Sequence, residues 1–161
     1  MKIRIKASVD CVSSAPVILD PNTADPRLVL SDDLTKRFNS YPCVLGSEGF
    51  NSGTHCWDVE VKESGLWSLG VTTASNQRKG GVFFNTDVWC VSYRWTAGFR
   101  VKQKLDRVRV NLDYDGGTVS FSDPVTNTHL HTFTTTFTHT LFPFFRCGFS
   151  GSLRILPVNS Q

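Results

Sequence analysis

The sequence predicts an all-β protein, most simply an antiparallel sandwich of two sheets. Short runs of alternating apolar and polar residues recur between clusters of turn-forming residues, and no long run keeps a helical period. The 12 Phe, 4 Trp and 3 Tyr are typical of half-buried strands. A chain of 161 residues is long enough for one domain with its own core.

The alternation places the strands in order along the chain. They are expected at Val17–Leu19, Arg27–Leu30, His55–Val61, Leu66–Thr72, Val88–Tyr93, Arg107–Leu112, Thr118–Phe121, His129–Phe133, Phe142–Cys147 and Leu153–Leu156. One weak helical turn is expected near Ser31–Arg37. Asp115-Gly116-Gly117 separates two of the clearest runs, and its glycines are expected to supply the positive φ angles of a tight β-hairpin.

Period-two alternation also assigns faces. Trp57, Val59 and Val61 are expected to face the core, whereas Asp58 and Glu60 face the other way. Two carboxylates on one face could suggest glycosidase chemistry, but a solvated or ion-paired strand face is the more common arrangement. The pair therefore gives little weight to catalysis.

A second strand carries the first candidate contact residues. Its alternation places three residues in the core, namely Trp89, Val91 and Tyr93. Cys90, Ser92 and Arg94 are then expected to line the opposite face, close to Trp95. Arg and Trp dominate the energetic centres of protein interfaces, so this patch is a candidate binding surface. A solvated strand residue is the competing interpretation of Arg94.

Composition excludes several classes. The net charge of +3 is small, no basic run stands out, and no run of 18 apolar residues occurs, so neither nucleic acid nor a membrane is expected as a partner. The five cysteines are widely spaced without a Cys-x-x-Cys pair. They are expected to be reduced, mostly buried thiols of a cytoplasmic protein.

Several ordered motifs resemble one known family. They are Val17–Pro26 with Leu28–Asp32, Tyr41–Phe50, Ser52–Val61, Trp67–Val71, Asn76–Gly80, Asn111–Asp123 and Leu141–Phe145. Together they resemble the PRY-SPRY (B30.2) domains, as found at the C-terminus of tripartite-motif ubiquitin ligases, butyrophilins and NOD-like receptors. The fish-venom stonustoxin type is a further possibility within the resemblance.

The resemblance implies a bent two-sheet sandwich of concanavalin-like jelly-roll topology, with an N-terminal extension and PRY segment at 1–40 and a SPRY segment at 41–161. It implies a partner protein bound through variable loops and a concave sheet face, without catalysis or a cofactor. The family's contact positions fall on Ser92, Arg94 and Phe149. Arg78 and Lys79 lie on a loop leading toward that face, and Trp95 with Phe149 are the expected apolar anchors.

The chain departs from the family pattern in two places. Leu34–Phe38 and Gly98–Leu105 are both shorter than the variable segments expected there. Because these segments belong to the variable rim in the family, the departures bear on the exact binding surface and leave the core motifs unaffected.

The sequence contains candidates for two other kinds of site. His129 and His131 are expected to share a strand face, as zinc ligands often do, but no third ligand is near in sequence, so no metal is expected. Five residues, Arg94, Trp95, Arg100, Lys102 and Lys104, form a basic cluster, with Arg107 and Arg109 beyond it. They support an alternative function, the sensing of a small phosphorylated or anionic ligand, against an edge strand protected by its charges.

Overall fold

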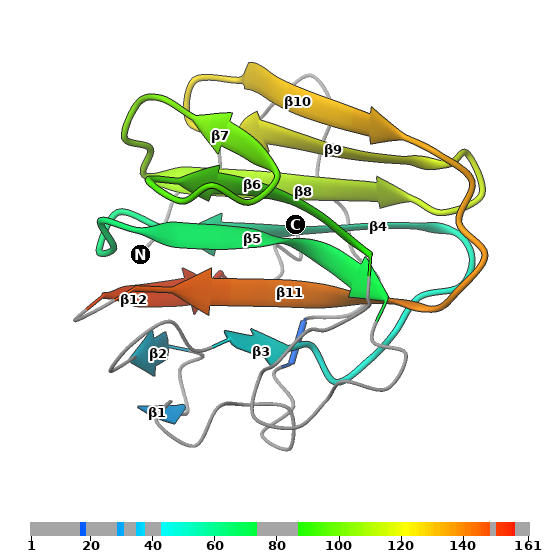
Figure 1. Cartoon of the computed structure of the whole chain (residues 1–161), viewed down its shortest axis with the longest axis horizontal. Coiled ribbons are helices and arrows are strands. Elements are labelled where there is room, and N and C mark those ends of the chain that lie inside the picture. The colour runs from blue at the N-terminus through cyan, green and yellow to red at the C-terminus, as the bar shows by residue number, and fades with distance from the viewer. Residues whose placement is uncertain are drawn as a thin grey trace.

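The computed structural model describes residues 17–18, 29–30, 35–37, 43–73, 87–148 and 151–156. Strands in these residues form two sheets, with the five-stranded sheet in front of the seven-stranded sheet in Figure 1. The expected all-β, two-sheet sandwich is therefore confirmed. Among the residues described, no helix has the length and hydrophobicity needed to cross a bilayer.

The seven-stranded sheet has the order β1-β2-β12-β4-β8-β9-β10, and its neighbouring strands are antiparallel. In chain order its strands are β1 Val29–Leu30, β2 Thr35–Arg37, β4 Thr54–Glu60, β8 Arg107–Asp113, β9 Thr118–Asp123, β10 Thr128–Thr134 and β12 Ser152–Ile155.

The five-stranded sheet has the order β3-β11-β5-β6-β7. Its strands are β3 Cys43–Leu45, β5 Trp67–Thr73, β6 Val88–Tyr93, β7 Phe99–Val101 and β11 Leu141–Cys147. The pair β6–β7 is parallel, unlike the other pairs, which corrects the expectation of a purely antiparallel sandwich.

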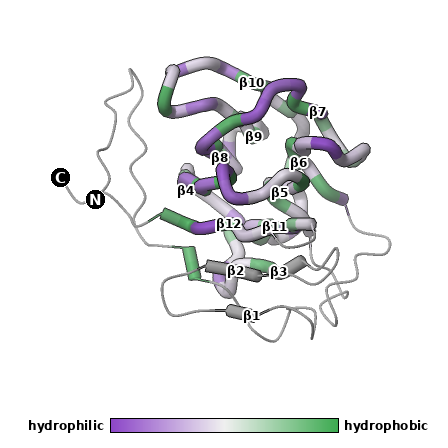
Figure 2. The backbone as a smooth tube through the Cα atoms, turned by 90° about the vertical axis from the view of Figure 1, so that its left-hand side faces the viewer, coloured by the Kyte–Doolittle hydropathy of each residue, from purple (hydrophilic) through white to green (hydrophobic). Residues whose placement is uncertain are grey.

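The main core lies between the sheets and follows the predicted faces. Trp57, Val59 and Val61 are buried there, and Val91 meets them from the other sheet, with Trp89 and Tyr93 packed against the same cluster. Figure 2 views the two layers from the side, with hydrophobic and hydrophilic residues alternating along much of the tube. Side chains of one parity therefore build the core, and the other parity forms the two outer faces.

The predicted hairpin joins β8 to β9, with Asp113 paired to Thr118 across the turn. Only the second glycine has a positive φ, because Gly117 lies at +75°. Gly116 lies close to the carboxylate of Asp113, whose Oδ1 accepts a hydrogen bond from the Gly116 N–H at 2.9 Å. Asp115 stabilises the turn from outside by accepting a hydrogen bond from the backbone N–H of Gly53 at 2.9 Å.

Two local predictions were wrong. The helical turn expected near Ser31–Arg37 is not formed at its C-terminal end, where Thr35–Arg37 is strand β2, paired with β1 and β12. Pairing partners that are distant in sequence override a weak local propensity of this kind. The expected PRY segment otherwise lies mostly outside the described residues.

The second error concerns the two histidines of β10. A β-bulge between them gives His129 the partner Ser122 and His131 the partner Phe121, so the rings lie on opposite faces. His131 stacks on Phe99 at 4.3 Å between ring centres. The described residues contain no group of three possible metal ligands, and the shared-face expectation is corrected by the bulge.

The cysteines are not all reduced. Cys90 and Cys147 are free and buried, as expected, but Cys56 is disulfide-bonded. Its partner is not among the described side chains. The outer face of the seven-stranded sheet around Cys56 is also covered, because Asp58 and Arg109 on the same face are 7% and 3% exposed.

Candidate functional site

The candidate site lies on the outer face of the five-stranded sheet, where the chain leaves β6. Residues 94–98 fold back across their own strand and return as β7, so that Val91 pairs with Phe99 and Ser92 with Arg100. We call these residues the return loop. A parallel pair needs a crossover connection. Here the crossover is very short, and it passes over the face that carries Cys90 and Ser92.

Two backbone conformations make this reversal possible. Arg94 has a φ of +60° at the start of the return loop, and Gly98 has a φ of +62° at its end. A Cβ on Gly98 would lie 2.2 Å from the carbonyl oxygen of Cys90, so only glycine allows this approach. The segment Gly98–Leu105, expected as a shortened loop, thus contains the edge strand β7.

Ser92 holds the return loop from below. Its side chain is fully buried, its hydroxyl donates a hydrogen bond to the carbonyl oxygen of Ala97 at 2.7 Å, and its Oγ lies 2.9 Å from Ser68 Oγ. The expected side of the sheet is therefore right, but the return loop covers Ser92. Ser92 was expected to contact a partner directly, but in the structure its side chain lies beneath the return loop and supports it.

Cys90 lies in the same buried layer. Burial raises the pKa of the Cys90 thiol, and hydrogen bonds with Ser68 and Ser92 and the nearby charge of Arg146 oppose that rise. The thiol packs with Leu45 and Phe144 in a second, smaller apolar cluster on this outer face. The return loop therefore packs on a small apolar cluster on the outer face of the five-stranded sheet.

The surface of the return loop presents an arginine and a tryptophan. Arg94 is exposed, and its Cζ lies 5.6 Å from the ring centre of Tyr93. Trp95 is half-buried, and the guanidinium of Arg146 on β11 lies 4.9 Å from its ring centre. The same guanidinium lies 5.5 Å from the ring of Phe144, so it is held between two aromatic side chains.

Arg146 and Phe144 were missed in the sequence. The alternation Phe144, Phe145, Arg146 within β11 placed Arg146 opposite the core residue Phe145, and this was the signal available. Its position beside Trp95 depends on the return loop, whose path no local pattern specifies. Arg78, Lys79 and Phe149 lie outside the described residues, so their predicted roles stay predictions.

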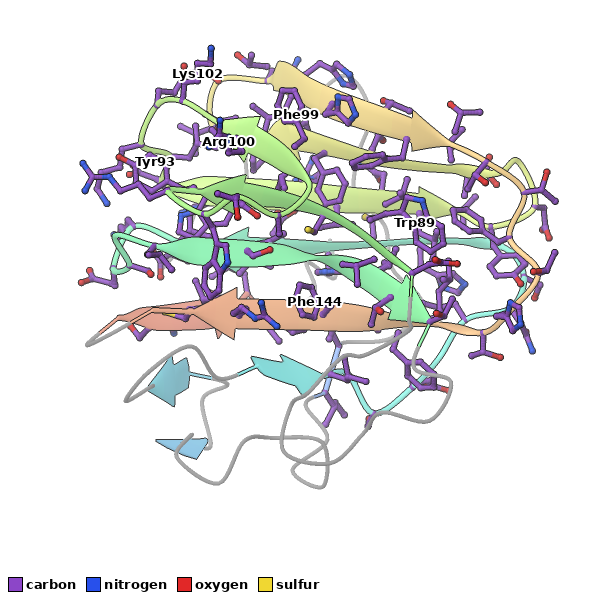
Figure 3. The ribbon with its side chains drawn as sticks, viewed as in Figure 1. Trp89, Tyr93, Phe99, Arg100, Lys102 and Phe144 are labelled. Carbon is purple, nitrogen blue, oxygen red and sulfur yellow. The ribbon has the colours of Figure 1, made fainter. Side chains whose placement is uncertain are left out.

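The predicted basic cluster is spread over different parts of the molecule. Arg100 and Lys102 are exposed at the β7 edge (Figure 3), whereas Lys104 Nζ donates a hydrogen bond to the carbonyl oxygen of Lys62 at 3.2 Å. Arg109 belongs to the other sheet and is buried in an ion pair with Asp58 at 2.8 Å. Only part of the cluster therefore faces the same surface as Arg94.

Comparison with known proteins identifies the family. Residues 54–158, more than half of the chain, match the family described as SPRY domain. The chain belongs to the SPRY family. The SPRY chain is 36% identical over 90% of its length to human zinc finger protein RFP, and 37% identical over 84% of its length to mouse butyrophilin subfamily 2 member A2. It covers 34% and 32% of those relatives, about a third of their length.

Solved structures agree on the fold. The SPRY chain is similar to stonustoxin with a TM-score of 0.73 and 28% identity, covering 88% of this chain and 27% of the other. The TRIM65 PSpry domain gives a TM-score of 0.72, with 89% of this chain and 91% of that chain covered. At 18% identity, the second likeness supports the fold alone. The resemblance seen in the sequence motifs is confirmed.

Proposed function

We propose that this SPRY domain is a non-catalytic recognition module that binds a partner protein through the outer face of its five-stranded sheet. The observation that carries the proposal is the rigid display of Arg94 and Trp95. Three features hold the return loop in the unbound domain. They are the positive φ of Arg94, the close approach of Gly98 to Cys90, and the hydrogen bond from Ser92 to Ala97. Pre-organised loops of this kind lose little conformational entropy on binding.

The side chains have the chemistry of an interface centre. Arg and Trp are enriched among residues that dominate binding energy, and here Trp95 and Arg146 already stack on each other. Phe149, Arg78 and Lys79 lie outside the described residues and remain further predicted contact residues. In the relatives this domain is about a third of a longer protein. We therefore propose that it recruits the target of a tripartite-motif-like ubiquitin ligase or of an immune receptor, with any transfer activity located in other domains.

The test is affinity capture followed by a direct binding measurement. The wild-type domain and its Arg94→Ala and Phe149→Ala variants are used as bait, and captured proteins are then titrated by calorimetry. Either variant should weaken the partner by more than about 1 kcal/mol, roughly a fivefold change in Kd, with the melting temperature nearly unchanged.

Arg154→Ala is the matched control, because Arg154 is an exposed arginine on β12 of the other sheet. It should bind like the wild type. Equal affinity of all three variants, or a loss confined to Arg154→Ala, would place the interface elsewhere on the domain.

The small-anion sensor is the second candidate, favoured by the exposed cations Arg94, Arg100 and Lys102 on one surface. It is the weaker proposal because Lys104 of the cluster is bonded to a backbone carbonyl, and Arg109 beyond the cluster is paired with Asp58. A thermal-shift screen with phosphorylated metabolites separates the two. Stabilisation by such a compound, lost in Arg100→Ala, would favour the sensor.

A further inference from the structure

Charge is divided unequally between the two sheets. The strands of the five-stranded sheet contain no Asp or Glu, whereas the described strands of the other sheet carry Asp58, Glu60, Asp113 and Asp123. The asymmetry concerns acidic residues alone, because the strands of the seven-stranded sheet also carry five basic residues, Lys36, Arg37, Arg107, Arg109 and Arg154. The five-stranded sheet, whose strands carry no acidic residue, is therefore the surface from which the charge of the partner is inferred.

Apart from Arg146 on β11, the basic residues described on this side come from one continuous stretch. Residues 88–105 contain Arg94, Arg100, Lys102 and Lys104 and no acidic residue, although Asp87 and Asp106 flank the stretch. Ser92 pairs with Arg100 across β6 and β7, so Arg100 lies opposite the residue two positions before Arg94. Figure 3 shows Tyr93, Arg100 and Lys102 at the same end of the two strands.

Within the part of the chain that the structure describes, these cations form no ion pair. Arg94, Arg100 and Lys102 are exposed, and none of them forms an ion pair with a described residue. Acidic residues of the other sheet are already engaged: Glu60 pairs with Lys62 at 3.3 Å, and Asp58 with Arg109 at 2.8 Å. The surface thus presents uncompensated positive charge beside the Trp95–Arg146 stack.

Protection of an edge strand explains only part of the pattern. Lysine and arginine often prevent edge strands from pairing with other chains, and β7 is the edge of its sheet. That explanation covers Arg100 and Lys102. It does not cover Arg94, which lies in the return loop and not in the edge strand, in a left-handed conformation that β-strand protection does not require.

We infer that the partner presents an acidic protein segment to the surface formed by Arg94, Arg100 and Lys102, beside Trp95 and Arg146. This inference rests on the proposed function and specifies the chemistry of its partner. Complementary charge should accelerate association and make affinity dependent on salt, since exposed charges are screened over about 8–10 Å at physiological ionic strength.

The probe is a fluorescein-labelled peptide of Glu, Gly and Trp, compared with the same peptide in which Gln replaces each Glu. Fluorescence anisotropy is measured at 50 and 300 mM NaCl. The variant is Arg100→Glu/Lys102→Glu. The matched control is Lys62→Glu/Arg154→Glu, in which Lys62 follows β4 and Arg154 lies on β12 of the seven-stranded sheet. Each pair changes the net charge by the same amount, from +3 to −1.

The acidic peptide should bind the wild type at least tenfold more tightly than the Gln peptide, and should lose at least tenfold in affinity at the higher salt. Arg100→Glu/Lys102→Glu should lose at least tenfold, and the control less than twofold. Equal losses in both pairs would mean that net charge alone attracts the peptide, which would overturn the inference. Displacement of the peptide by a phosphorylated metabolite that itself binds more tightly would also overturn it, in favour of the small-anion sensor.

Failure of the inference is distinct from failure of the proposed function. If a captured protein loses affinity in Arg94→Ala but is indifferent to Arg100→Glu/Lys102→Glu and to salt, the recognition module stands and its partner is not acidic. Circular dichroism and the melting temperature establish that each variant is folded. If the Glu variants do not fold, Arg100→Gln/Lys102→Gln gives the same comparison with half the charge change.

Discussion

The hydroxyl of Ser92 donates a hydrogen bond to the carbonyl oxygen of Ala97 at 2.7 Å, and this contact joins the end of β6 to the loop that follows it. Ser92 was expected to be exposed on this face, but it is buried and supports the return loop that forms the surface. As a result the return loop lies over Cys90. The reactivity of the Cys90 thiol therefore measures how well Ser92 holds the loop in place.

Ser92→Ala should loosen the return loop without unfolding the sandwich. The variant removes the hydrogen bonds of Ser92 with the Ala97 carbonyl and with Ser68 Oγ, and each such loss costs about 0.5–1.5 kcal/mol. Alkylation of Cys90 by iodoacetamide in the native state should become faster, because the loop that covers the thiol opens more often. Mass spectrometry measures the rate. Ser120→Ala, on the outer face of the other sheet, should leave it unchanged, and an unchanged rate in Ser92→Ala would mean that other contacts hold the loop.

The buried thiol of Cys90 should also make stability fall at alkaline pH. Burial raises its pKa above the usual 9.0, so the unfolded chain loses this proton at a lower pH than the folded protein does. Stability from this group is complete below pH 9 and declines as pH rises toward the folded pKa. Urea unfolding at pH 7.5 and 10 measures the decline. It should be smaller in Cys90→Ala; an identical decline would exclude Cys90 as its source.

Thiol counting tests the unexpected state of Cys56. In denaturant without reductant, Cys90 and Cys147 should react with a maleimide, and Cys56 should react only after reduction, because it is disulfide-bonded. Peptide mapping assigns the labels. Cys56→Ser should release one additional reactive thiol from its partner. Labelling of Cys56 before reduction would restore the expectation of a reduced cysteine.

The sequence was most informative where local periodicity and pairing agree. Strands β4, β5, β6, β8 and β11 begin and end within a residue or so of the predicted runs, because each has one face in the core. Trp57 and Val91 were assigned correctly for the same reason. Alternation of side chains is a property of the strand itself, so it can be read without knowing its neighbours.

What the sequence did not predict depends on contacts between distant residues or on single backbone angles. The bulge at His129 and His131 reverses one face of β10, and the φ of Arg94 turns the chain back over β6. Neither leaves a signature in periodicity. Ser92 and Arg146 consequently acquired roles that alternation alone could not assign, one beneath the return loop and one beside Trp95.

Trp57 provides a stability prediction that is separate from the site. It is 4% exposed and stacks on Phe50 at 5.9 Å between ring centres. Trp57→Ala should lower the free energy of unfolding by about 3–5 kcal/mol, because it leaves a large cavity in the main core. Chemical denaturation measures the change. Trp95→Ala removes the same side chain from a half-buried position and should cost clearly less; equal costs would contradict the core assignment of Trp57.

Removing one partner of the Arg109–Asp58 ion pair should lower the free energy of unfolding strongly, whereas neutralising both partners should lower it much less. Arg109 Nε and Nη2 donate hydrogen bonds to the two carboxylate oxygens of Asp58 at 2.8 and 3.0 Å, and both side chains are buried. Arg109→Met leaves a buried carboxylate without its bidentate donor, which should cost about 3–5 kcal/mol. Asp58→Asn in the same chain removes the stranded charge and should recover much of that loss.

A double-mutant cycle in urea gives the coupling free energy between the two positions. If the pair acts as one unit, the cost of the double variant Asp58→Asn/Arg109→Met will be well below the sum of the single costs. Simple additivity would mean that Asp58 is satisfied by other partners once Arg109 is gone. In that case the buried carboxylate of Asp58 would be stabilised mainly by groups other than Arg109 on the outer face of the seven-stranded sheet.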